Sequence, residues 1–264
     1  MDTQQVLSSL YLSYIGHATV LIEMDGIRLL TDPLLRSRVG LLRRKGTVPD
    51  LALYQNVDAV LISHIHPDHL DLLSLRLLAR GTQLIVPRGA GKALLQRKFQ
   101  NVTELRAGET VELGPSKITA TYAKHHAFGH RLGPNTDCLG FIISGSYEVY
   151  FAGDTGLFPE MAKLAENLDV ALLPVWGWGP RLRGHHLTPY QAAQAVALLR
   201  PRLAVPIHWG TFYPLGMGWM RTHFLTRPPH DFAQHVARLA PRVEVRVVPP
   251  GGTLQWGRDS ESIG

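Results

Sequence analysis

Short apolar segments alternate with turns and helical patterns along almost the whole chain. Runs of apolar positions, or apolar and polar positions in alternation, predict β-strands, and Asp25-Gly26 is typical of a hairpin turn between two of them. The region 33–56 has no regular pattern. The predicted strands are 10–15, 19–24, 27–30, 59–62, 83–86, 117–123, 141–144, 147–152, 170–173, 203–207 and 243–248.

Helical patterns separate these strands. One helix opens at Thr188-Pro189-Tyr190-Gln191, which combines a capping box with proline at the first helical position, and Pro201 ends it. No linker rich in Pro, Gly or Ser divides the chain, so we expect one α/β domain over residues 1–264, with two mixed sheets sandwiched between helices. The other predicted helices are 70–79, 90–98, 158–166 and 231–239.

The composition favours a folded domain in a reducing compartment. Hydrophobic residues make up 45% of the 264 residues and charged residues 18%, so the chain can bury a core. The single cysteine, Cys138, cannot form an internal disulfide, and its apolar surroundings indicate packing rather than chemistry. No signal peptide is apparent and no apolar stretch is long enough to span a bilayer, so we expect a cytoplasmic location.

The chain is moderately basic, with 27 Lys plus Arg against 21 Asp plus Glu and a formal charge of +6. This excess favours anionic substrates or peripheral contact with an anionic membrane, although an ordinary solvated basic surface explains it equally simply. Five cations lie within residues 36–45, interleaved with leucines. They predict either a lid that recognises phosphate or lipid head groups or a solvated loop. The cations are Arg36, Arg38, Arg43, Arg44 and Lys45.

The segment 63–69 carries the strongest chemical signal, with three imidazoles and a carboxylate directly after the apolar run 59–62. Side chains of an extended chain alternate, so His64 and His66 point the same way and can share one metal ion. Asp68 and His69 lie beyond that alternation and can face a second ion. One such residue alone would be a structural histidine or a helix N-cap, whereas four together predict a metal site.

Other strand ends supply the further donors that a dinuclear centre needs. Asp154 follows a hydrophobic strand between two glycines, where it can bridge two ions or simply form a turn. His208 ends the strand 203–207, and His125 and His126 end the strand 117–123. Histidine or aspartate at three independent strand ends is the arrangement that a metal site between sheets requires.

Several short motifs follow one another in a fixed order. They are Tyr14-Ile15-Gly16-His17-Ala18-Thr19, Thr31-Asp32-Pro33, His64-x-His66-x-Asp68-His69, Gly153-Asp154-Thr155 and Ile207-His208-Trp209-Gly210-Thr211. Over about residues 10–212 this order resembles the metallo-β-lactamase superfamily. It most resembles the branch that contains N-acyl-phosphatidylethanolamine phospholipase D and the ascorbate-phosphate lactonases. The resemblance implies an αββα sandwich.

The resemblance also implies the ligand sets. One ion would be held by His64, His66, His125 and Asp154, and the other by Asp68, His69, Asp154 and His208. The family often has an aromatic residue where His126 stands, so the choice between His125 and His126 stays open, and we favour His125. His186 matches a histidine placed beside the substrate, or is a surface loop residue. Asp32 would orient a ligand imidazole, or form a turn before Pro33.

Two divalent ions that share a carboxylate lower the pKa of a bound water and supply hydroxide at neutral pH. We therefore expect a hydrolase that cleaves an ester-type bond of a small anionic or phosphorylated substrate, a phosphodiester or a phosphorylated lactone, with Asp68 and His186 as catalytic residues. Zinc suits the donors best, with manganese or iron as alternatives. Nucleic acid is not expected, because the inserted domain of nucleic-acid-processing members is missing. The alternative is a non-catalytic metal-binding scaffold.

Overall fold

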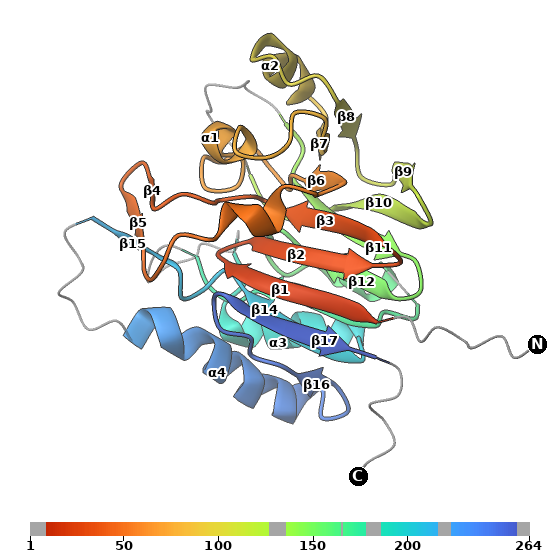
Figure 1. Cartoon of the computed structure of the whole chain (residues 1–264). Coiled ribbons are helices and arrows are strands. Elements are labelled where there is room, and N and C mark those ends of the chain that lie inside the picture. The colour runs from red at the N-terminus through yellow and green to blue at the C-terminus, as the bar shows by residue number, and fades with distance from the viewer. Residues whose placement is uncertain (1–8, 127–135, 165, 178–185, 216–222, 258–264) are drawn as a thin grey trace, which may run out of the picture.

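The computed structural model describes residues 9–126, 136–164, 166–177, 186–215 and 223–257. Two seven-stranded mixed sheets pack against each other, and helices cover their outer faces (Figure 1). The predicted αββα sandwich is therefore confirmed. None of the helices in these described ranges is long and apolar enough to cross a membrane.

The first sheet joins the N-terminal strands to the last strand of the chain. Its strands from β17 to β3 pair antiparallel, and those from β3 to β8 pair parallel. In spatial order it contains β17 (Gly252–Trp256), β1 (Leu10–Gly16), β2 (Thr19–Met24), β3 (Ile27–Thr31), β6 (Ala59–Leu61), β7 (Gln83–Pro87) and β8 (Val102–Leu105).

The second sheet combines a parallel half with an antiparallel half, and a small third sheet lies apart from both. The second sheet contains β16 (Glu244–Val245), β14 (Leu203–Ile207), β13 (Val170–Pro174), β12 (Glu148–Phe151), β11 (Leu139–Ser144), β10 (Ser116–Tyr122) and β9 (Thr110–Leu113) in spatial order. The third contains β15 (Phe212–Pro214), β5 (Leu42–Arg44) and β4 (Arg38–Val39).

The described helices are short apart from two. Thr188 caps α3 with the predicted capping box, and its side chain accepts a hydrogen bond from the amide of Gln191. The helix α4 runs through Pro228 and Pro229, although the sequence predicted a start only after them. The helices are η1 (Leu51–Tyr54), α1 (Leu72–Leu75), α2 (Gly91–Gln96), η2 (Pro159–Lys163), α3 (Pro189–Leu199) and α4 (His223–Leu239).

The alternation of side chains explains why the sheets form layers. In β2, Val20 and Ile22 pack into the core between the two sheets, whereas Leu21 packs on the opposite face. On that opposite face Leu21 shares a second core with Leu75 of α1 and Leu94 of α2. The central strands are covered on both faces, and this is why their sequences are continuous apolar runs.

Strand direction brings the polar strand ends to one edge of the sandwich. In the first sheet β1, β3 and β6 run the same way, because two antiparallel pairings and one parallel pairing connect them. In the second sheet β10, β12 and β14 share a direction for the same reason. Each of these six strands is followed, within a few residues, by a histidine or an aspartate.

Several predicted elements differ from the structure. The predicted helix 158–166 is wrong, because Pro159–Lys163 forms a 3₁₀ helix, and residue 165 lies outside the described residues. The helix predicted at 70–79 shortens to Leu72–Leu75 and continues in turns, where Leu77 and Leu78 bond three residues back. The region 33–56 contains β4, β5 and η1, and the sequence reading did not predict β8, β9, β15 or β17.

The two sheets touch most closely where β6 and β12 end. Gly153 has a φ of +59°, and a Cβ placed on it would lie 2.5 Å from the Cβ of Ser63. In the same place the amide of Leu139 donates to the carbonyl of Ser63 at 2.9 Å. Only glycine fits a positive φ and this close an approach together, so Gly153 fixes how the two sheets meet at the polar edge.

Replacing Gly153 by alanine should lower the free energy of unfolding by about 3 kcal/mol, because backbone strain and the clash with Ser63 add. The matched control is Gly108→Ala, where φ is +91° but nothing lies within 4 Å of the new Cβ. This variant should lose only about 1 kcal/mol, the cost of the strained backbone alone. Urea denaturation measures both, and equal losses would contradict the role of the close approach.

Candidate metal centre

The polar edge gathers a buried cluster of imidazoles and carboxylates from both sheets. Its members lie in segments that follow several different strands, and four of them follow β6. His64, His69, His208 and Asp32 are almost completely buried. The members are His17, Asp32, His64, His66, Asp68, His69, His125, Asp154, His186 and His208.

Three imidazoles form the first donor group. The Nε2 atom of His64 lies 2.8 Å from the Nδ1 atom of His66, and Nε2 of His125 lies 3.2 Å from the same atom. Donor nitrogens from the three rings lie within 4.8 Å of one another. Three ring nitrogens at this spacing suit a single transition-metal ion.

A second donor group lies next to the first, with the rings of His64 and His69 4.1 Å apart between centroids. It contains His17, Asp68, His69 and His208, again with donor atoms within 4.8 Å of one another. Nε2 of His17 lies 3.1 Å from Oδ2 of Asp68, and Nε2 of His69 lies 3.8 Å from that oxygen. The rings of His17 and His208 are 4.0 Å apart between centroids. This group mixes nitrogen and oxygen donors, unlike the first.

Asp154 reaches imidazoles of both groups, because one of its carboxylate oxygens also lies within 4.8 Å of a donor nitrogen of His125. Its Oδ1 atom is 3.2 Å from Nε2 of His208, and its Oδ2 atom is 3.3 Å from Nε2 of His69. Oδ2 also lies 3.3 Å from Nδ1 of His186. With only 3% of its side chain exposed, Asp154 is a carboxylate held away from water among imidazoles, the position of a bridging ligand.

Asp32 orients two of the imidazoles through hydrogen bonds at their Nδ1 side, away from the Nε2 atoms that face the cluster. Its Oδ2 atom accepts hydrogen bonds from the Ser63 hydroxyl at 2.6 Å and from Nδ1 of His69 at 2.7 Å. Its Oδ1 atom accepts from the amide of Ser63 at 2.7 Å.

The Ser63 hydroxyl also orients His64, because it is hydrogen-bonded to both Asp32 and His64. Because its hydrogen points to Asp32, the hydroxyl oxygen accepts from Nδ1 of His64, 2.9 Å away. His64 and His69 therefore both carry their proton on Nδ1 and present Nε2 to the cluster. Such outer hydrogen bonds select the tautomer that binds metal.

Burial and charge give the imidazoles different proton affinities. Burial, helped by the neighbouring His69, lowers the pKa of His64 well below its ordinary value. Burial and His125 lower the pKa of His66 to about 4. Burial also lowers the pKa of His69, but the carboxylates of Asp154, Asp32 and Asp68 outweigh it, and the net pKa lies well above the ordinary value. His64 and His66 are thus neutral at pH 7, whereas His69 also holds a second proton, on Nε2.

The donor set fits divalent metal ions. Nε2 of His69 and Oδ1 of Asp154 are buried and have no hydrogen-bond partner among the described residues. Leaving buried polar atoms unsatisfied is costly, so a cation that accepts lone pairs from both groups would relieve the deficit. Imidazole nitrogens with a few carboxylate oxygens suit zinc best, and also manganese or iron.

The backbone is strained at three members of the cluster. His17, Asp32 and His208 have φ values of 59°, 34° and 63°, which non-glycine residues seldom adopt. Each follows directly after a strand, where the turn aims its side chain into the cluster. Strain of this kind costs about 1–3 kcal/mol per residue and concentrates at functional sites.

The structure brings together all seven residues predicted as metal ligands, and His186 as well. It places His125 in the first donor group, while His126 is exposed and joins none of the donor groups found among the described residues. Asp71 caps α1 by accepting from the amide of Ser74, and it also pairs with Arg36 at 2.7 Å.

Sequence reasoning missed the importance of His17 and Ser63. His17 belongs to the motif at residues 14–19 and has no predicted role of its own, yet it is 2% exposed and contacts Asp68. Its position directly after a strand, like that of His208, is the signal that could have identified it. Ser63 lies inside the metal motif, but only the coordinates reveal that its hydroxyl links Asp32 to His64.

The arginine-rich segment 36–45 divides into buried and exposed cations. Arg44 is 6% exposed, donates to the carbonyls of Leu34, Ile15 and Arg36, and lies over the ring of Phe212. Arg36 pairs with Asp71. The remaining cations, Arg38, Arg43 and Lys45, are exposed on the small third sheet. The segment is therefore part of a small sheet rather than an irregular loop.

Comparison with known proteins yields a consistent set of similarities. The model of the family described as "Beta-lactamase superfamily domain" matches residues 27–209. A "UPF0173 metal-dependent hydrolase" of Methanopyrus kandleri is 32% identical over 251 residues, which are 92% of this chain and 99% of the relative. An "N-acyl-phosphatidylethanolamine-hydrolyzing phospholipase D 1" of Caenorhabditis elegans is 31% identical over 235 residues, 79% of this chain and 66% of the relative.

A solved structure agrees with these sequence matches. Igni18, described as a metallo hydrolase from Ignicoccus hospitalis, superposes with a TM-score of 0.72 at 30% identity. The match covers 94% of this chain and 98% of that chain. The similarity therefore extends over both sheets and the polar edge between them.

Replacing Asp32 by asparagine should weaken metal binding about 10- to 100-fold, because the variant cannot accept from Ser63 and His69 as the carboxylate does. The control is Asp169→Asn, another buried carboxylate, which accepts from the amide of Glu148 away from the cluster. Its metal affinity should stay within about twofold of wild type. Competition with a chromophoric chelator measures both, and an unchanged affinity in Asp32→Asn would contradict the orienting role.

The two donor groups should respond differently to pH in the metal-free protein. Between about pH 7 and pH 6, an ion bound by His64 and His66 displaces no proton, because their pKa values lie well below this range. An ion bound by His69 must displace its proton, so that affinity should fall about tenfold per pH unit as the pH drops below the raised pKa. Stepwise zinc titrations at several pH values measure the slopes, and parallel slopes would contradict the assignment.

Proposed function

We propose, from the premise that the chain belongs to the metallo-β-lactamase superfamily, that it is a metal-dependent hydrolase with two divalent ions in its active site. The observation that carries this proposal is the position of Asp154 between two separate donor groups. A single ion would need only one of the groups. The name of the Methanopyrus kandleri relative, a metal-dependent hydrolase, supports the reaction class.

In this proposal the chain's own side chains hold the two ions apart. His64, His66 and His125 would hold one ion and Asp68, His69 and His208 the other, with Asp154 shared between them. His17 contacts Asp68 and would either orient it or add a donor. The donor set suits zinc best, and the two ions would supply hydroxide at neutral pH and neutralise the charge that develops on the substrate.

His186 is the proposed proton donor on the substrate side. Its Nδ1 atom lies 3.3 Å from Asp154, and its side chain is 22% exposed, so it borders both the cluster and solvent. Burial lowers its pKa, but Asp154 outweighs burial and the net pKa is raised. A raised pKa keeps a proton on the ring near neutral pH, which a departing alkoxide needs. Asp68, whose carboxylate reaches both His17 and His69, would position the second ion for the same reaction.

The proposed substrate is a small anionic molecule with an ester-type bond, a phosphodiester or a phosphorylated lactone. The exposed cations Arg38, Arg43 and Lys45 support an anionic substrate, and they flank Leu41, which is 74% exposed. Their sheet contacts the cluster through Phe212, whose ring lies 5.8 Å from that of His17. Cations around an exposed leucine also suit an anionic lipid surface, and the Caenorhabditis elegans relative is named for a lipid substrate.

The single domain over residues 1–264 and the cytoplasmic location stay predictions from the sequence.

The non-catalytic scaffold stays the alternative function, since a fold can keep its metals without turning over substrate. Metal content after gentle purification does not by itself separate a scaffold from an enzyme, so turnover must be measured as well. An enzyme should hold about two ions per chain and hydrolyse a substrate, whereas a metal-binding scaffold holds ions without turnover.

Protein loaded with zinc or manganese should hydrolyse at least one member of a panel of phosphodiesters, phosphorylated lactones and thioesters. The phosphodiesters are offered both as short-chain soluble compounds and as lipids in anionic vesicles, which separates a soluble substrate from a membrane one. Replacing His186 by alanine should lower kcat about 100-fold and leave the metal content unchanged, because the residue donates a proton rather than holding an ion. Initial rates and elemental analysis measure the two effects.

The matched control is His230→Ala, an exposed histidine of α4 outside the cluster, which should keep the wild-type rate. Loss of bound metal in His186→Ala would make this residue a ligand rather than a proton donor. No turnover across the whole panel, in protein that holds two ions, would favour the scaffold.

A further inference from the structure

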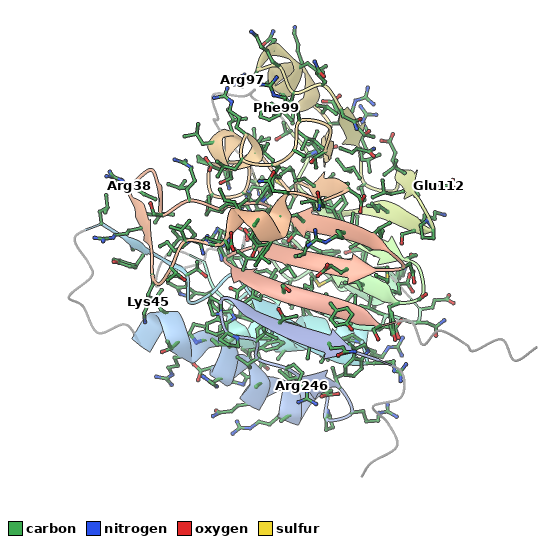
Figure 2. All side chains as sticks on the ribbon, viewed as in Figure 1. Arg38, Lys45, Arg97, Phe99, Glu112 and Arg246 are labelled. Carbon is green, nitrogen blue, oxygen red and sulfur yellow. The ribbon has the colours of Figure 1, made fainter. Side chains whose placement is uncertain are left out.

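A cavity of about 610 Å³ lies at the end of the molecule formed by α1 and α2. It opens between the turns that follow α1, the start of β7 and the segment that connects α2 to β8. Figure 2 shows two of its lining residues, Arg97 and Phe99, beside α2. No lining residue belongs to the metal cluster. The cavity is thus a feature separate from the candidate active site.

The lining of this cavity is strongly cationic. It includes Arg76, Arg80, Arg97 and Lys98, and no aspartate or glutamate is among the described residues that line it. Within the described part of the chain, none of these four cations forms an ion pair with a carboxylate. Four positive charges around one concave surface repel each other unless an anion lies between them.

The floor of the cavity is apolar, and one wall is aromatic. Leu75, Leu78 and Leu84 line it and belong to the core beneath α1 and α2. Phe99 packs against this core and stays partly exposed. Ligand pockets commonly combine apolar walls with a few polar groups that fix orientation.

A buried hydroxyl in the lining lacks a partner. Thr82 is 8% exposed, and its Oγ1 atom has no hydrogen-bond partner among the residues that the structure describes. Buried hydroxyls are nearly always paired, so this hydroxyl is available to bond a water or a polar group of a ligand in the cavity.

The turn that carries the cations into the cavity is strained. At the end of α2 the amide of Phe99 donates to the carbonyl of Leu94, and the amide of Lys98 donates to that of Leu95. This is the pattern of a Schellman motif, in which glycine usually takes the left-handed position. Lys98 takes it here, with a φ of 68°. A lysine in a glycine position costs stability, and here it places a cation at the cavity.

We propose that this cavity binds a small organic phosphate. The phosphate would lie among the arginines, whose guanidinium groups suit its geometry, while a planar or aliphatic part packs against Phe99 and the leucines. A nucleotide and an alkyl phosphate share this chemistry. Nothing in the proposed hydrolase reaction requires this second site, so the two proposals stand or fall independently.

The test is calorimetric titration of the metal-loaded protein with AMP, ATP, dodecyl phosphate and inorganic phosphate. At least one organic phosphate should bind about tenfold or more tightly than inorganic phosphate, because only it reaches the apolar floor. The double variant Arg76→Ala/Arg80→Ala should weaken that binding at least tenfold. Both arginines are exposed, so the variant should fold.

The matched control is Arg88→Ala/Lys92→Ala, which removes the same charge from exposed residues near α2 that do not line the cavity. Its affinity should stay within about twofold of wild type. AMP or ATP as the tighter ligand would indicate a planar group, and dodecyl phosphate an aliphatic one. The proposal is overturned if none of the organic phosphates binds, if inorganic phosphate binds as tightly, or if the two double variants lose affinity equally.

Discussion

The buried carboxylate of Asp32 orients the side chains at the polar edge of the molecule through its hydrogen bonds. Asp32 accepts three hydrogen bonds, two from Ser63 and one from His69, at distances of 2.6–2.7 Å and without exposure to solvent. Through Ser63 it also determines which nitrogen of His64 carries the proton. A charge buried this deeply is tolerated only when its hydrogen bonds are complete. The orientation of one imidazole in each donor group, His64 and His69, therefore depends on the hydrogen bonds of Asp32.

The cluster exists because strand direction and close packing bring distant segments together. Six strands that end at the same edge supply every member except His186, which lies between β13 and α3. Gly153 lets the ends of β6 and β12 approach closely enough for one carboxylate to reach imidazoles from both sheets. Burial, reinforced by neighbouring imidazoles, lowers the pKa of His64 and His66, whereas three carboxylates raise the pKa of His69. The geometry thus prepares His64 and His66 as neutral donors and leaves an additional proton on His69.

The sequence predicted the parts of this structure that local pattern determines. Apolar runs located the central strands, and the spacing of His64 and His66 predicted the first donor group, because alternation is a local property. Pairing over long separations is not local, so β17, which pairs with β1, was missed. The roles of His17 and Ser63 were missed for the same reason, since each depends on a partner from another strand. The edge strands β8 and β9 were missed because exposed positions weaken their apolar pattern.

The backbone hydrogen bond between His208 and His17 affects the order in which the cluster assembles. The amide of His208 donates to the carbonyl of His17 at 2.7 Å. The first and the last cluster members along the chain are therefore held together by a backbone hydrogen bond. During synthesis the N-terminal strands and the His64 to His69 segment leave the ribosome long before their partner. A nascent chain therefore presents an incomplete set of imidazoles to the metals around it until the segment that carries His208 has also emerged.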